Sequence, residues 1–351
     1  MNKSQLREFA LWAKGHLEEQ IRFSCERIGI SANGIKPLVA SGSIYRLEGF
    51  SEVYDASFAR KRERLVHSIQ NNEFGLNHVI EEVAYTWFNR LVALRYMELN
   101  RYIPHGYRVL SSEIAGQVEP DVLKHINNIA NELQVNVQEI RDLLGKNQLE
   151  SAYRKVLLKQ CNALHDILPM LFEQEQDYTE LLLPNVLLGQ GAIIDRLTQL
   201  DEDNFNDVEI IGWLYQYYIS SKKDEYFSSP EKASKDTIPA ATQIFTPDWI
   251  VRYMVDNSLG KLWLDSYPDS GLRSKLKYYL EPAEQTLEVQ AQLSALIEKN
   301  LRVENIRFLE PCAGSGHILV YAFEVFYQMY LEQGYRKSDR KSVVVGKSVD
   351  L

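Results

Sequence analysis

The residues with the clearest chemical potential lie in the stretch FLEPCAGSGHILVYAF, residues 308–323. A short apolar run leads into the acidic residue Glu310, a turn with Gly314 and Gly316 follows, and a helical pattern comes after it. Glycines let the backbone approach a ligand closely, and the first turn of a helix presents N–H groups that have no partner within the helix. The order strand, glycine turn, helix therefore predicts a site for a nucleotide-like ligand.

The sequence does not match three well-known glycine motifs. A dinucleotide fingerprint needs a third glycine after Gly314 and Gly316, and Leu319 stands there. A hydrolase nucleophile elbow needs glycines two residues on either side of Ser315, and neither is present. The stretch VVVGKS ends like a phosphate-binding P-loop, but Lys341 replaces its first glycine. What remains is an acid, a short spacer and Gly-x-Gly.

That remaining pattern, Glu310 followed by Gly314 and Gly316, resembles the first motif of class I S-adenosylmethionine-dependent methyltransferases. Taken alone, the same letters also fit a tight turn that only packs. A second stretch upstream, QIFTPDWIVRYMV at 243–255, resembles the second cofactor motif of DNA adenine methyltransferases. Aromatic-Thr-Pro first and acid-Pro-x-x-Gly-Ser-Gly second is the motif order of the γ-type adenine-N6 enzymes.

The resemblance extends along most of the chain. The stretches EEVAYTWFNRLVALRYMELN, IIGWLYQYYISSKKDE, IPAATQIFTPDWIVRYMVDNSLGKLW and FLEPCAGSGHILVYAFEVFYQMYLEQGY look like PglX, the adenine-specific methyltransferase family of BREX phage-defence systems. The likeness is collinear and runs to about Tyr335. Two letters depart from the commoner form, which has aspartate in place of Glu310 and alanine before cysteine in place of Cys312-Ala313.

The resemblance implies a role for each motif residue. The cofactor-binding set is Phe245, Thr246, Pro247, Glu310, Pro311, Gly314, Ser315 and Gly316. The backbone of the glycine turn would lie against S-adenosylmethionine, Glu310 would accept from its amino group, and the Phe-Thr-Pro turn would hold its methionine end. Thr246 is a candidate N-cap, with Pro247 and Asp248 in the first turn behind it. His317 is interpreted as a first-turn surface or packing residue rather than a catalyst, and no metal site is expected.

A motif that the resembled family needs for catalysis is absent from these 351 residues. Adenine-N6 transfer requires a flipped base whose amine is held by Asn/Asp-Pro-Pro-Tyr/Phe. No catalytic residue is therefore assigned, and we expect this chain alone to be inactive. Residues 337–351 do not resemble the family. We interpret them either as a disordered end or as the product of a frameshift or sequence-assembly error that replaced the true continuation. An uncovered strand and helix would then favour aggregation.

Several elements must position these motifs. Apolar spacing predicts helices over 4–28 and 78–104, further helices between 121 and 200, and others over 207–229, 283–300 and 315–331. Strands are predicted for LVASGSIYRLEGF, weakly, and for VENIRFLEP at 303–311, and a linker or lid for SPEKASKDTIPAA.

These elements predict a two-part organisation. Residues 1–205 form a mainly α N-terminal helical domain. Residues 206–336 begin an α/β class I methyltransferase domain, Rossmann-like and truncated, with cofactor motifs at 243–256 and 308–319. Residues 337–351 form the tail outside the family.

Composition limits the class of protein. The chain has 45% apolar and 25% charged residues, a net charge of −9, three scattered cysteines and no apolar run of membrane-spanning length. These values predict a reduced, cytoplasmic, globular protein that binds no membrane. The run RKRER at 60–64 is a candidate phosphate contact, although such runs are more often solvated helix faces.

The function predicted from these observations is S-adenosylmethionine-dependent adenine-N6 methylation of double-stranded DNA, of which this chain would be an N-terminal fragment. The partners implied are DNA, through the full-length protein, and other BREX defence proteins. One alternative is a catalytically dead helical module that docks defence proteins or DNA. A nicotinamide-dependent oxidoreductase is a third reading, disfavoured by Leu319 and by Glu310-Pro311.

Overall fold

The computed structural model describes residues 2–42, 44–72, 75–172, 178–206, 209–228, 238, 246–313 and 316–335. The chain divides into two compact units, Met1–Ala241 and Thr242–Leu351. Each unit has its own cluster of buried apolar side chains. The boundary predicted between residues 205 and 206 falls inside the first unit. Its place in the domain organisation of the resembled family remains a prediction.

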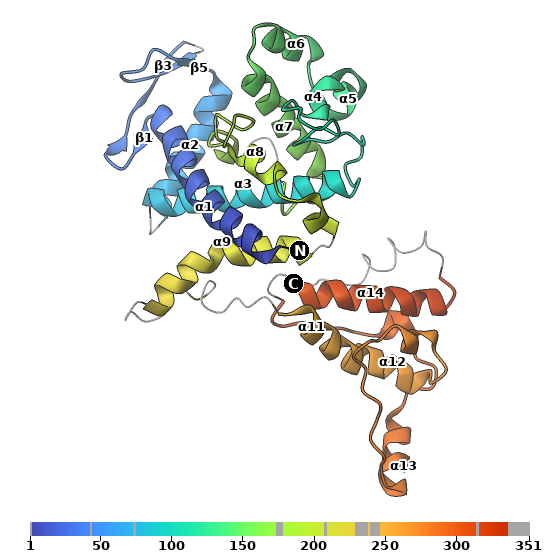
Figure 1. The fold of residues 1–351 in the computed structure, drawn as a ribbon. Helices are drawn as coiled ribbons and strands as arrows, with labels where there is room; N and C mark the ends of the chain where they lie inside the picture. The colour runs from blue at the N-terminus through green and yellow to red at the C-terminus, as the bar shows by residue number, and fades with distance from the viewer. Residues whose placement is uncertain are drawn as a thin grey trace. The chain divides into compact units, whose positions relative to one another are not determined.

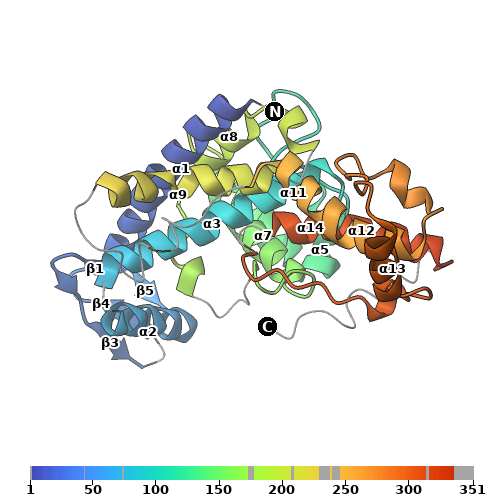
Figure 2. The ribbon, with the colours of Figure 1, turned by 90° about the horizontal axis from the view of Figure 1, so that it is seen from below.

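Three long helices form the centre of the first unit: α1 (Lys3–Arg27), α3 (Gly75–Leu99) and α9 (Glu209–Ser228). Helix α1 packs against both α3 and α9 (Figure 1 and Figure 2). The side chains that α1 buries recur at every third or fourth position: Leu6, Phe9, Ala10, Ala13, Leu17 and Ile21. This spacing places them on one face of the helix, so the helical periodicity seen in the sequence is confirmed.

Shorter helices complete the first unit. They are α2 (Ala56–Asn71), α4 (Asp121–Lys124), α5 (Ile126–Leu133), α6 (Val137–Gly145), α7 (Leu149–Leu164), α8 (Ile193–Thr198) and the 3-10 helices Tyr178–Glu180 and Glu202–Asn206. Buried side chains from most of them join the cluster centred on α3, where Trp87 is fully buried. The prediction that this part of the chain is mainly helical is therefore confirmed for the described residues.

Two small antiparallel sheets follow α1. Strand β1 (Ile30–Ser31) pairs with β2 (Gly34–Ile35), and the second sheet has the order β3-β4-β5. Its strands are β3 (Leu38–Ser41), β4 (Ile44–Leu47) and β5 (Val53–Tyr54). Leu38 lies opposite Leu47 in the register. The strand predicted for LVASGSIYRLEGF is confirmed as this hairpin.

The basic run RKRER lies in α2, and two of its cations bind the fold itself. Arg62 is buried and donates to the carbonyls of Ile28 and Lys36 at 2.8 and 2.7 Å. Lys61 pairs with Glu180 at 2.6 Å. The Arg62 guanidinium is the hydrogen-bond partner of two backbone carbonyls and therefore has a structural role. At least part of the basic run is thus neither a solvated helix face nor a phosphate contact.

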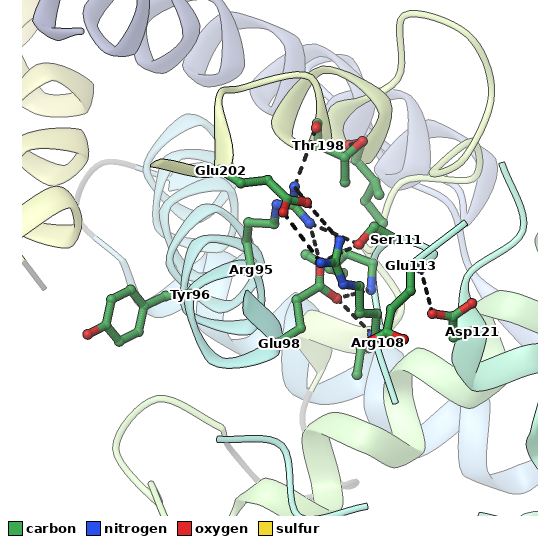
Figure 3. Close-up of polar contacts among 12 residues, drawn as sticks. Arg95, Tyr96, Glu98, Arg108, Ser111, Glu113, Asp121, Thr198 and Glu202 are labelled. Atoms are coloured by element: carbon green, nitrogen blue, oxygen red, sulfur yellow. Dashed lines mark hydrogen bonds and ion pairs between the residues drawn. The ribbon is translucent and has the colours of Figure 1, made fainter. Parts of the chain in front are cut away.

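A buried polar cluster joins α3 to the loop that follows it (Figure 3). Glu98 accepts from the backbone N–H groups of Val109 and Leu110, each at 2.7 Å. Arg95 donates to Glu98 at 2.7 Å and to Glu202 at 3.2 Å. One carboxylate thereby orders a loop with no regular structure of its own, and its charge is matched by a buried guanidinium.

The second unit is built around helix α14 (His317–Glu332), which packs along α11 (Asp248–Val255). The chain continues from α11 through a π-helix, Asp256–Gly260, into α12 (Lys261–Ser266). A Cβ at Gly260 would lie 2.6 Å from Leu276 Cδ1, so glycine permits this close approach. The main buried side chains are Val251, Val255, Leu259, Trp263, Leu272, Leu276, Tyr321, Val325 and Met329.

The strand predicted at 303–311 is wrong for this structure. Val303–Asn305 is a 3-10 helix, and 306–310 has no regular structure. Ile306 and Phe308 are half-buried while Arg307 and Leu309 are exposed, so the segment keeps the alternation of a strand. A strand also needs a hydrogen-bonded neighbour, and no other strand is formed among the described residues of the second unit.

Helix α13 (Leu287–Leu296) confirms the helix predicted near 283–300, but none of its residues is buried. The chain runs from α12 through a 3-10 helix, Gly271–Ser274, and then through α13 to the segment 303–310 (Figure 1). The predicted linker 229–241, except Ile238, and the predicted tail 337–351 lie outside the described residues. No helix in the described part of the chain is long and apolar enough to cross a membrane.

Candidate functional site

Five of the eight predicted cofactor residues lie in described parts of the second unit. They are Thr246, Pro247, Glu310, Pro311 and Gly316. The other three, Phe245, Gly314 and Ser315, lie outside the described residues. Thr246 and Pro247 lie at the beginning of α11 and Gly316 at the beginning of α14, while Glu310 and Pro311 precede α14 in the sequence.

Helix α11 begins one residue later than predicted. Pro247, with φ −55° and ψ 141°, is the N-cap, and no side chain caps the helix. The predicted N-cap Thr246 is therefore wrong, because the extended ψ of Pro247 delays the first helical residue to Asp248. Asp248 does occupy the first turn, as predicted, and accepts from Arg252 Nε at 2.7 Å.

Helix α14 begins at a glycine that the backbone requires. Gly316 is the N-cap with φ 77°, in the left-handed region that favours glycine. A Cβ built on Gly316 would meet no atom within 4 Å, so open space lies in front of it. No side chain caps the helix, so the amides of its first turn have no side-chain cap within the described residues.

A single hydrogen bond brings the two helix beginnings together. The Nδ1 atom of His317, the first residue of α14, lies 3.1 Å from the carbonyl oxygen of Thr246, just before α11. The positive ends of two helix dipoles therefore meet at one corner, which we call the N-terminal corner. It comprises Thr246, Pro247, Gly316 and His317, and α11 and α14 run together behind it (Figure 1).

Glu310 lies just before the glycine turn. Its Oε1 accepts from the backbone N–H of Cys312 at 2.8 Å. Its second oxygen, Oε2, has no hydrogen bond to any described residue, so one carboxylate oxygen is available to a ligand. The acid thus shapes the turn and presents a negative group beside it.

A polar chain behind the N-terminal corner holds α11 against α14. The guanidinium of Arg252 lies 4.5 Å from the ring centre of Tyr321, and the Tyr321 hydroxyl donates to the fully buried Asp256 at 2.8 Å. Asp256 also accepts from Tyr278 N–H at 2.9 Å. Burial and the bond to Asp256 raise the pKa of Tyr321, so the phenol remains a donor at neutral pH.

Sequence reasoning missed these supporting residues. Asp256 stands directly after an apolar helix, and Tyr321 lies one turn beyond His317 in α14. A carboxylate at the end of an apolar stretch is a recognisable signal, because a buried charge needs partners. The identity of the partner, 65 positions away, carries no local signal.

The three cysteines differ in exposure, and we expect them to differ in reactivity. Burial raises the pKa of Cys25 in α1 and of Cys161 in α7 to about 12, whereas Cys312 beside the glycine turn is exposed. Because the thiolate is the nucleophile, iodoacetamide at mildly alkaline pH should modify Cys312 alone. Peptide mass spectrometry measures this, with the guanidinium-unfolded chain, in which all three react, as the control. Early modification of Cys25 would contradict the packing of α1.

Comparison with known proteins shows which proteins the chain is similar to. No family model matches the chain. It is nevertheless similar over 99% of its length to curated proteins named as adenine-specific methyltransferases. The resemblance to this class, suggested by the two motifs, is therefore confirmed.

Two relatives can be named. The adenine-specific methyltransferase BrxX of Escherichia coli O9:H4 (strain HS) is 41% identical over 357 residues. The adenine-specific methyltransferase PglX of Lacticaseibacillus casei (strain Zhang) is 38% identical over 380 residues. The chain is similar in sequence to PglX and spans 29% of the length of the first relative and 31% of the second.

Proposed function

We propose that this chain is the cofactor-binding part of an S-adenosylmethionine-dependent DNA adenine-N6 methyltransferase. The observation that carries the proposal is the N-terminal corner, where the Thr-Pro turn and the glycine turn meet through His317 and Thr246. Thr246, in one motif that the resemblance assigns to the cofactor, and His317, directly after the other, are 71 positions apart in the sequence but 3.1 Å apart in space. The names of the relatives support the same class of reaction.

The polar groups at this corner and at Glu310 fit the proposed cofactor. S-adenosylmethionine carries a carboxylate and an ammonium group at its methionine end, and a sulfonium methyl that it supplies for transfer. Uncapped first-turn amides of α11 and α14 suit the carboxylate, and the free oxygen of Glu310 suits the ammonium group.

The roles proposed for the remaining motif residues follow the family resemblance. The backbone of Gly314, Ser315 and Gly316 would lie against the cofactor, and Phe245, Thr246 and Pro247 would hold its methionine end. Pro311 would stiffen the entry to the turn. In a complete α/β domain, 306–310 would become a strand with one packed face, because half-buried and exposed residues alternate along it.

The residues proposed here bind and orient the cofactor, and none is proposed to bind the target adenine of the DNA. The 351 residues contain no Asn/Asp-Pro-Pro-Tyr/Phe motif, so the chain alone is expected not to transfer a methyl group. Double-stranded DNA and other defence proteins are proposed as partners of the whole protein, in the cytoplasm. The names of the relatives do not favour a catalytically dead docking module.

A ligand panel tests this function. Isothermal calorimetry with the whole chain should show binding of S-adenosylmethionine and S-adenosylhomocysteine and no binding of NAD. With tritiated cofactor and unmethylated duplex DNA, no label should pass to adenine. Binding of NAD in place of S-adenosylmethionine would overturn the proposed function. Label on adenine would contradict the expected inactivity of the chain.

A further inference from the structure

We propose that His317 is a positioning residue for the cofactor, because it locks the Thr246–Pro247 turn against the glycine turn. This inference rests on the proposed function and deepens it. His317 belongs to none of the motif positions that the resemblance assigns, and the sequence alone suggested only a surface or packing role. Its contact with Thr246 gives it a defined task at the N-terminal corner.

The geometry fixes which imidazole nitrogen carries the proton. A carbonyl oxygen only accepts, so the 3.1 Å contact with Thr246 requires N–H at His317 Nδ1. The neutral ring then has its proton on Nδ1, with Nε2 as the acceptor. His317 is half-buried as the first residue of α14, so the turn of Gly316 directly sets the position of its ring.

The peptide that His317 holds has a single hydrogen-bonding group. Pro247 has no N–H, so the Thr246–Pro247 peptide can be anchored only through the Thr246 carbonyl. A regular helical bond does not take that carbonyl, because the N–H groups of Ile250 and Val251 both donate to Pro247 O, at 2.9 and 3.2 Å. His317 is therefore the donor that orients this peptide.

The orientation of that peptide matters because the two motifs must face the same ligand. Without the His317 bond, the Thr-Pro turn would sample other orientations, and cofactor binding would have to select the correct one. Loss of preorganisation lowers affinity without removing any direct contact to the ligand. The effect should therefore appear in the dissociation constant of S-adenosylmethionine.

Three substitutions in the whole chain test the role of Nδ1. His317→Ala removes the donor, His317→Asn places an amide N–H close to the position of Nδ1, and His317→Gln places it close to Nε2. We expect His317→Ala to raise the calorimetric Kd about tenfold, the value of one hydrogen bond of ordinary strength. His317→Asn should recover affinity to within about threefold of wild type, and His317→Gln should behave like alanine.

A readout independent of the cofactor accompanies the titrations. The carbonyl oxygen of Phe172, 2.6 Å from Nδ1 of His165, requires a second imidazole of the same form. Long-range ¹H–¹⁵N spectra of the ligand-free chain should therefore show Nδ1-protonated signals from both His165 and His317, and only the His317 signal should vanish in His317→Ala. Equal affinity of wild type and His317→Ala overturns the inference while leaving the proposed function standing. Equal losses in the alanine and asparagine variants, with lowered melting temperatures, also overturn it, because they indicate a merely structural role. Failure of wild type to bind at all overturns the proposed function, and this inference with it.

Discussion

Gly316→Asp is expected to abolish S-adenosylmethionine binding while leaving the second unit folded. The new carboxylate would stand at the start of α14, where it would compete for the first-turn amides and repel the carboxylate of the cofactor. Like charges brought together at a binding site cost several kcal/mol, so we expect a loss of ~100-fold or more. Aspartate tolerates the left-handed conformation better than most residues, and its charge suits the positive end of the helix.

The opposite end of the same helix supplies a matched control. Gly334 has φ 85°, and a Cβ there would also meet no atom within 4 Å. Gly334→Asp adds the same side chain to the same kind of backbone, but near the negative end of the helix, where it should lower the melting temperature slightly. We therefore expect Gly334→Asp to retain binding although it is the less stable variant, and Gly316→Asp to lose binding although it is the more stable one. Equal calorimetric affinities for the two variants would contradict the location of the site.

Glu98→Ala is expected to destabilise the first unit by about 3–5 kcal/mol, the usual cost of leaving the partner of a buried ion pair alone. The side chains of Arg95 and Glu98 are 1% and 0% exposed. Removing the carboxylate leaves the Arg95 charge dependent on the partly exposed Glu202, and it takes the acceptor from the N–H groups of Val109 and Leu110. The Nε of Arg95 already has no hydrogen-bond partner among the described residues, so little compensation is available.

Hydrogen exchange of the α3 amides measures this loss within the first unit, because one melting curve for a chain of two units does not give one free energy. The control is Glu52→Gln, which breaks an exposed ion pair, Arg27–Glu52, at 3.8 Å. Such a pair contributes ~0–1 kcal/mol, so protection in α3 should hardly change. Similar losses in both variants would refute the structural role of the buried cluster.

Local sequence patterns were sufficient to predict most of the longer helices, although α2 was not predicted. The apolar spacing of α1 and the glycine at the start of α14 are signals within a few residues, and the structure confirms both. The helix α13 was predicted from the same kind of spacing, yet it buries none of its residues. Periodicity predicts a helix, but it does not specify what the helix packs against.

Long-range partners could not be predicted in the same way. The contact between His317 and Thr246 and the bond between Tyr321 and Asp256 join residues more than 60 positions apart, and neither pair has a motif of its own. The segment 303–310 illustrates the complementary case. Its alternation is that of a strand, but strand formation depends on a neighbour that no local pattern supplies.

Hydrogen–deuterium exchange of the whole chain, with and without saturating S-adenosylmethionine, tests the central claim most directly. The account predicts slower exchange at 248–250 in the first turn of α11, at 317–320 in the first turn of α14 and at 310–313 before it, with little change in α1, α3 and α9. Protection confined to the first unit, or no protection at either helix beginning despite measured binding, would contradict the claim that the N-terminal corner holds the cofactor.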